Sequence, residues 1–165
     1  VNIGFESFSI KNLKAMGKSF NDPPHYADAV KRIHDHGIGI MGTFMVGLDD
    51  DDPGVFQRII DFCIDSRLDW ALTFIMAPYP GTESFLRLER EERILCRDWE
   101  KYDSLNVVYQ PLLMSVEDLE KGMRRIWKEV FSLSSIYKRI LRRPWIHPLF
   151  YLVMNLQFHH LTKKW

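Results

Sequence analysis

The sequence has few cysteines, with only Cys63 and Cys96 among its 165 residues. Two thiols this far apart cannot form a disulfide framework or a thiolate metal cage. Cys63 lies in an apolar helical pattern, which is typical of a small core residue. So few cysteines are usual in a reducing compartment, and we expect a cytoplasmic protein.

An excess of charge of either sign is also lacking, since 22 basic residues balance 22 acidic ones. Such a chain has no overall field to attract a polyanion, so we expect no nucleic-acid partner. The longest uninterrupted apolar run, Leu149–Met154, is far too short to cross a bilayer.

Common catalytic and phosphate-binding motifs are missing as well. The sequence contains no Walker loop, no G-x-G-x-x-G and no Ser–His–Asp set that we can place. His34-Asp35-His36 falls at a predicted helix end without an evident third ligand, so we do not expect a metal there. We expect neither a catalytic residue nor a metal ligand within this chain.

Strand and helix patterns alternate over the first two-thirds of the chain. Strands are predicted at Val1–Phe5, Ile38–Val46 and Trp70–Ala77, the second covered on both faces because it is apolar throughout. Capping or first-turn residues predict the helices: Ser9, Pro23-Pro24, Asp52-Pro53 and Thr82. Three βα units imply a parallel sheet, and three strands cannot close a barrel. We therefore expect further strands upstream of Val1, which already lies inside a strand.

From about Arg93 the pattern becomes mainly helical. We expect two parts, an α/β unit over residues 1–92 and a helical extension over residues 93–165. Ser115 predicts the cap of a long helix, and breaks are predicted at Arg143-Pro144 and His147-Pro148. The apolar stripe of the long helix is predicted to be Leu119, Met123, Ile126, Trp127 and Val130.

The end of the chain is basic and aromatic. No Asp or Glu follows Glu129. The residues that follow include Lys138, Arg139, Arg142, Arg143, Lys163, Lys164, Trp145, Phe150, Tyr151, Phe158 and Trp165. A helix packed on its own protein, with a solvated basic face, is the preferred interpretation. Peripheral contact with the inner membrane surface is the alternative.

Polar residues follow all three predicted strands, at Glu6-Ser7, at Gly47 with Asp49–Asp52, and at Pro78–Thr82. Carboxyl ends of parallel strands meet at one edge, where α/β proteins bind ligands. Glu6 and Ser7 could hold ribose hydroxyls or an ammonium group, and Gly47 allows close approach to the backbone. The acidic run lacks the spacing of a calcium loop, so we interpret it mainly as a solvated loop that caps a helix.

These three segments together resemble radical S-adenosylmethionine barrels. VNIGFES followed by LKAMGKSFN resembles their fourth strand and helix. HDHGIGIMGTFMVGLDDD resembles the fifth strand, and APYPGTESFLRLEREERIL the sixth. The stretch from Arg97 to Leu133 is similar to the extension that follows the barrel in a cobalamin-binding subgroup, which includes hopanoid methylases.

The resemblance implies half of a partial (β/α)6 barrel and the cofactors S-adenosylmethionine, a 4Fe-4S cluster and cobalamin. It places Glu6 and Ser7 against S-adenosylmethionine, and Met45, Val46 and Gly47 against its adenine and ribose. Asp49 and Asp50 follow on the same loop, and Pro78, Tyr79 and Gly81 shape a turn near the adenine. The family's C-x3-C-x2-C motif and cobalamin domain are absent from this sequence. We therefore expect a longer parent protein to be active and this chain alone to be inactive.

The expected reaction is cobalamin-dependent methyl transfer or a related C–H functionalisation. The substrate would be a small or lipid-like molecule, and the parent protein would need an electron donor. One alternative is a cobalamin-independent methylthiolase or oxidative cyclase. A non-catalytic half-barrel that binds or scaffolds is another.

Overall fold

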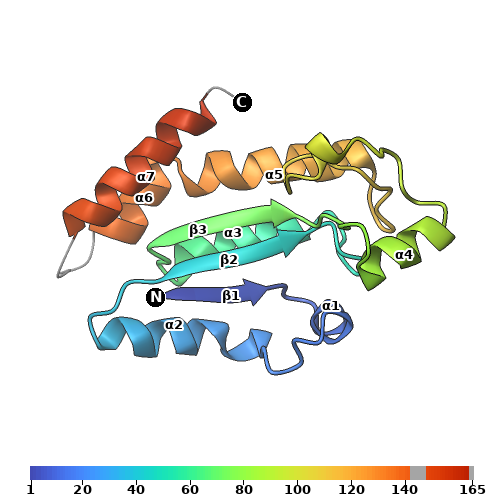
Figure 1. The fold of residues 1–165 in the computed structure, drawn as a ribbon. Helices are drawn as coiled ribbons and strands as arrows, with labels where there is room; N and C mark the ends of the chain where they lie inside the picture. Colours follow the sequence, from blue (N-terminus) through green and yellow to red (C-terminus); the bar gives the residue numbers. More distant parts are fainter. Residues whose placement is uncertain (142–147, 164–165) are drawn as a thin grey trace.

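A computed structural model describes residues 1–141 and 148–163 of the chain. Its strands are β1 (Asn2–Glu6), β2 (Met41–Val46) and β3 (Trp70–Ile75), which form one parallel sheet in the order β1-β2-β3 (Figure 1). The predicted α/β class and the parallel sheet are confirmed. β2 is shorter than predicted and begins at Met41 rather than Ile38.

Helices connect the strands as the sequence pattern predicted. They are α1 (Ile10–Ala15), η1 (Pro23–His25), α2 (Tyr26–Asp35), α3 (Val55–Asp65) and α4 (Glu83–Arg90). Ser9 and Thr82 are confirmed as caps, since each side chain accepts a hydrogen bond from the backbone N–H of the residue three positions later in the sequence. The predicted cap at Asp52 is wrong. Pro53 and Gly54 form a turn, and the Asp52 carboxylate accepts from the Gly54 N–H before the helix begins.

The extension contains η2 (Trp99–Lys101), α5 (Val116–Val130), α6 (Leu133–Ile136), a π-helical turn η3 (Tyr137–Leu141) and α7 (Pro148–Thr162). Ser115 and Asp118 form a capping box at the start of α5. The break predicted at Arg143-Pro144 lies outside the described residues, as do His147 and the basic and aromatic residues Arg142, Trp145, Lys164 and Trp165.

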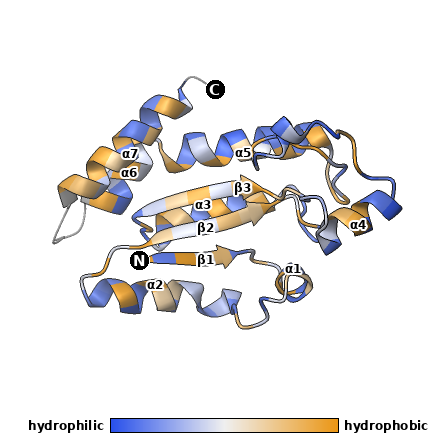
Figure 2. Ribbon diagram, in the orientation of Figure 1, coloured by the Kyte–Doolittle hydropathy of each residue, from blue (hydrophilic) through white to orange (hydrophobic). Residues whose placement is uncertain are grey.

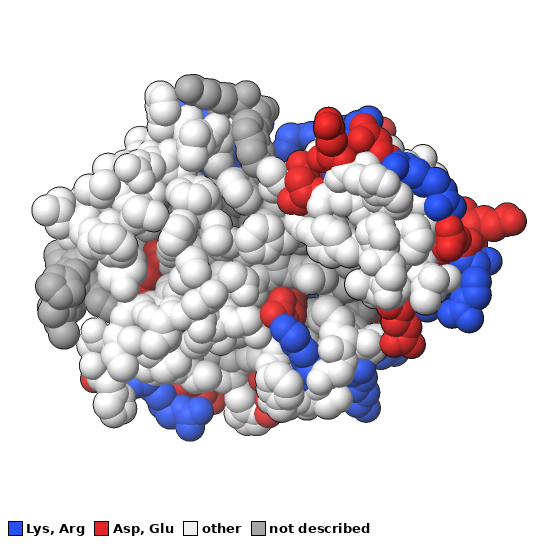
Figure 3. All heavy atoms as spheres, in the orientation of Figure 1, with Lys and Arg blue, Asp and Glu red and all other residues white. Residues whose placement is uncertain are grey.

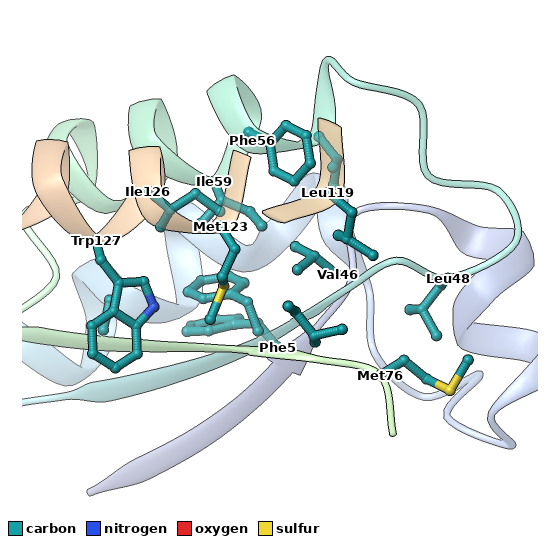
Figure 4. Close-up of a cluster of buried hydrophobic side chains, with 14 of the residues drawn as sticks. Phe5, Val46, Leu48, Phe56, Ile59, Met76, Leu119, Met123, Ile126 and Trp127 are labelled. Atoms are coloured by element: carbon teal, nitrogen blue, oxygen red, sulfur yellow. The ribbon is translucent and has the colours of Figure 1, made fainter. Parts of the chain in front are cut away.

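The core joins the α/β unit to the extension. The predicted stripe of α5 is buried and packs on α3 over the sheet (Figure 4). The helices are so close at Gly122 that a Cβ there would overlap the Phe56 ring. Each large apolar side chain buried at this contact contributes roughly 1.5–3 kcal/mol.

The two faces of the sheet differ in their cover. Phe44 and Val46 point toward α3 and are buried, whereas Met41, Thr43 and Met45 on the opposite face are only half-buried. Figure 1 shows α3 behind the sheet and no described helix in front of it, and Figure 3 shows that front face as largely uncharged. The expectation that β2 is covered on both faces is therefore wrong for the described part of the chain.

The two edges of the sheet differ as well. The extension covers the outer edge of β3, where the Ile75 N–H donates to the Ser104 carbonyl (2.8 Å) and the Trp127 indole N–H donates to the Thr73 carbonyl (3.3 Å). On the β1 side, no strand among residues 1–141 and 148–163 pairs with the outer edge.

Candidate functional site

The three polar strand ends share one edge of the sheet. Because β1, β2 and β3 are parallel, Glu6, Gly47 and the turn after Ile75 all follow carboxyl ends on the same side, near α1 and α4 (Figure 1). The prediction that they converge on one edge is confirmed. Such an edge is the usual ligand position in α/β folds.

Glu6 is held in an unusual backbone conformation at the end of β1. Its φ of 66° lies in the left-handed region, at an irregularity in the pairing with β2. The Glu6 carboxylate pairs with the Lys18 ammonium, and the side chain is mostly buried. Ser7 is buried, and its hydroxyl accepts from the Ser9 N–H at 3.0 Å. Ser7 thus supports the start of α1 in this structure.

Gly47 begins the loop after β2, and its conformation depends on the extension. Its φ is 87°, and its carbonyl accepts a hydrogen bond of 2.6 Å from the buried Tyr109 hydroxyl. A Cβ at Gly47 would overlap Tyr109 and Leu119. Glycine is therefore required for both the backbone conformation and the packing. No motif in the sequence marks Tyr109 as a partner of this loop.

Each carboxylate of the acidic run has its own partner. Asp49 pairs with Arg87 (2.7 Å) and Arg93 (2.9 Å). Asp50 accepts from the Ser9 hydroxyl (2.6 Å) and from Lys11 (3.0 Å). These contacts fasten the loop to α1 and to the segment after α4.

Asp51 is the buried member of the run, with 1% of its surface exposed. It accepts from the Leu48 N–H (3.0 Å) and the Asn12 side-chain amide (2.8 Å). Burial raises the pKa of Asp51 to about 7, although the backbone N–H groups of Leu48 and Gly47 act in the opposite direction. The interpretation of the run as a solvated loop is wrong for Asp51, because its carboxyl is buried and hydrogen-bonded inside the fold, whereas Asp52 is exposed.

Arg93 ties the same loop to the extension. Its guanidinium donates to Asp49, to Glu91 (2.8 Å) and to the Gln110 carbonyl (2.8 Å), and the residue is buried. Bonds of this charged kind are stronger than neutral ones. Together with Tyr109, Arg93 makes the extension a support for the loop after β2.

The other predicted site residues lie in two environments. Met45 is half-buried on the open face of the sheet, whereas the Val46 side chain is fully buried on the opposite face. Pro78 is buried and Tyr79 is half exposed. Gly81 has a φ of 84°, which the turn before α4 requires.

A cavity of about 410 Å³ opens at this edge. It is lined by residues that include Asn12, Met16, Leu48, Asp49, Met76 and Arg87. Its volume lies in the range of small-molecule sites, and its lining combines apolar side chains with polar and charged ones, Glu83 and Ser84 among them. Asp49 is the one predicted site residue in its lining, whereas the other nine, including Glu6 and Tyr79, lie outside it.

The residues of this chain do not fit an iron–sulfur cluster. Cys63 is fully buried, and burial raises the pKa of its thiol to about 12, while Cys96 lies in the extension. No group of three or more metal-ligating side chains occurs in the part of the chain that the structure describes. His34 bonds to Asp69 (2.9 Å) in the interior, so it supports the fold.

Comparison with known proteins gives several relatives, although no family model matches the chain. It is 34% identical, over 99% of its length, to the bacteriochlorophyllide d C-12(1)-methyltransferase of Chlorobaculum tepidum. It is 28% identical over 58% to the hopanoid C-2 methylase of Rhodopseudomonas palustris. A putative methylthiotransferase of Methanocaldococcus jannaschii is 34% identical over 56% of the chain.

These relatives are much longer than the chain, which covers 35%, 18% and 21% of their respective lengths. Their names describe transferases of methyl or methylthio groups. The similarity therefore supports a transferase-type enzyme and covers nearly the whole chain in the first of them.

Proposed function

We propose that this chain is the carboxy-terminal part of the catalytic barrel of a radical S-adenosylmethionine methyltransferase. The observation that carries the proposal is the 34% identity, over 99% of the chain, with a methyltransferase. The parallel sheet, with three polar strand ends on one edge, supports it. The unpaired outer edge of β1 is compatible with further strands of the same barrel.

The cofactor set is part of this proposal. The chain's residues would hold S-adenosylmethionine through the backbone of the Gly47 loop, the half-buried Met45 and the turn at Tyr79. The cluster ligands would have to come from a segment that this sequence does not contain, and so would the cobalamin domain. When bound, these groups supply a 5′-deoxyadenosyl radical and a transferable methyl group.

The residues of this chain would position the ligand and shield it from water. Asp51, Tyr109 and Arg93 fix the Gly47 loop, so its backbone would meet a nucleoside without first having to order. Leu48 and Met76 give the cavity apolar walls, which would exclude water from one side of the ligand. The substrate would be a small or lipid-like molecule, and an electron donor would act on the complete protein.

The test uses the complete polypeptide that contains this sequence, reconstituted without oxygen with iron, sulfide and cobalamin. After reduction it should release 5′-deoxyadenosine and transfer a deuterated methyl group from labelled S-adenosylmethionine. Failure to release 5′-deoxyadenosine at full iron occupancy would refute the assignment. The 165-residue chain, treated identically, should bind no cluster, and a stable four-iron signal would contradict its expected inactivity.

A cobalamin-independent methylthiolase is the second candidate, because one relative is a putative methylthiotransferase. The two differ in product mass, since a methylthio group adds sulfur as well as carbon. They differ also in whether cobalamin is needed for turnover. A non-catalytic half-barrel is the third hypothesis. It requires that the complete polypeptide lack the C-x3-C-x2-C motif.

A further inference from the structure

The last helix, α7, is fastened to the protein by polar groups on its inner face. The fully buried Asn155 donates to the Asp69 carbonyl (2.9 Å) and accepts from Arg139 (2.8 Å). His159 bonds to the Phe131 carbonyl (2.8 Å). These contacts fix which side of α7 faces the protein.

The outer side of α7 is mostly apolar, with Gln157 and His160 exposed among the apolar side chains, which reverses the usual pattern of a surface helix. We call its five exposed apolar residues the outer stripe: Leu149, Phe150, Val153, Leu156 and Leu161. They are 40–70% exposed and recur at helical spacing. Hydrophobic residues are seen along α7 as well as along β2 and β3 (Figure 2). Contiguous exposed apolar surface of this kind usually marks an interaction site.

The charge of the carboxy-terminal segment is of one sign. Lys163 directly follows α7 and is exposed, Lys138 is exposed in η3, and no Asp or Glu follows Glu129 in the sequence. Figure 3 shows a mostly uncharged surface at the α7 end, with acidic and basic side chains gathered toward α4 at the other. The stripe therefore fits a partner that combines apolar material with negative charge.

We propose that the outer stripe of α7 docks on an anionic lipid bilayer, with the helix lying in the interface. A bilayer surface offers acyl chains to the stripe and negative headgroups to the lysines. Among the described residues, none of the helices has the length and hydrophobicity of a membrane span. A second copy fits less well, since pairing two stripes would bring two basic ends together.

The position of α7 leaves the candidate site free. Asn155 binds the carbonyl of Asp69, directly before β3, and Tyr151 lies against Gly39, directly before β2. Both points are at the amino-terminal end of the sheet, opposite the cavity. Docking there would leave the cavity and the carboxyl ends of the strands open to ligands.

Vesicle co-sedimentation of the complete polypeptide that contains this sequence tests the proposal. That polypeptide should bind phosphatidylcholine vesicles that contain phosphatidylglycerol, and added salt should weaken binding. Val153→Ser with Leu156→Ser should reduce binding roughly tenfold or more, because two apolar side chains no longer insert. Lys138→Gln with Lys163→Gln should weaken binding and lessen its salt dependence.

Phe20→Ser is the matched control, because Phe20 is 80% exposed and lies between α1 and η1, beside β1. It should leave vesicle binding unchanged. All variants change exposed side chains, so circular dichroism should show an unaltered fold. Absence of binding by the unmodified polypeptide, or equal losses in the Phe20 and stripe variants, would overturn the proposal. So would a dimer in light scattering that the stripe variant dissolves.

Discussion

Removal of the Tyr109 hydroxyl tests whether the extension stabilises the conformation of the loop after β2. In Tyr109→Phe the ring still fills its site, so the change deletes one buried hydrogen bond, of 2.6 Å, to the Gly47 carbonyl. Burial raises the pKa of Tyr109 well above its usual value, so the hydroxyl stays neutral and donates at any physiological pH.

The expected loss of unfolding free energy is about 1–2 kcal/mol. A buried hydrogen bond contributes about 0.5–1.5 kcal/mol net, and a buried carbonyl left without its donor adds part of its desolvation cost. The loss should appear as a lower midpoint in urea with an unchanged slope, because the surface exposed on unfolding is the same.

Hydrogen exchange of individual backbone amides tests more directly where in the structure the stability is lost. The Leu48 N–H bonds to Asp51, and the Asp51 N–H bonds to the Leu48 carbonyl. Both amides should exchange with solvent faster in Tyr109→Phe, because the loop opens locally more often. Tyr102→Phe is the matched control, since its hydroxyl donates to the Cys96 carbonyl (2.7 Å), away from the loop. Equal acceleration of these two amides in both variants would refute the reasoning.

Three further predictions concern the core and the extension. Arg139→Met should lower the free energy of unfolding in urea by about 3 kcal/mol or more, because five hydrogen bonds from a fully buried guanidinium to its acceptors are lost. The matched control, Arg125→Met at an exposed position, should lower it by less than about 0.5 kcal/mol. Gly122→Val should lower the melting temperature through overlap with Phe56, at a cost of about 1–3 kcal/mol, and Phe56→Leu should restore part of the loss. Stability should fall by at most about 4 kcal/mol as pH rises from about 4 to about 7. Between these pH values the folded protein keeps a proton on Asp51, whose pKa is raised to about 7, whereas the unfolded chain has already released it. Asp51→Asn should therefore flatten the dependence of stability on pH. An unchanged pH dependence in this variant would contradict the raised pKa of Asp51.

The fold of the α/β part was largely predictable from local patterns. Ser9, Thr82 and Ser115 each mark a helix start by a side chain that acts on its own backbone within four residues. Such short-range chemistry can be read without knowing the rest of the molecule. The start of α3 was placed too early, because an Asp-Pro pair fits either a cap or a turn.

The interior of the candidate site was less predictable. The position of the loop after β2 was expected, but its fastening depends on Tyr109 and Arg93, which lie far along the chain. The sequence indicates a solvated Asp51, because nothing in the sequence distinguishes this buried carboxylate from the three aspartates beside it. Long-range partners of this kind leave no periodic pattern, so only coordinates reveal them.

The coverage of the sheet restricts how copies of this chain could join. Open-ended growth by strand addition requires two free borders, one to receive a copy and one to offer to the next. Here the Ser104 carbonyl and Trp127 occupy the edge beside β3, so in the described part of the chain the outer edge of β1 is the one left to pair with another strand. Association through the sheet should therefore stop at a pair, and fibrils built by edge-to-edge stacking should not form from the folded state.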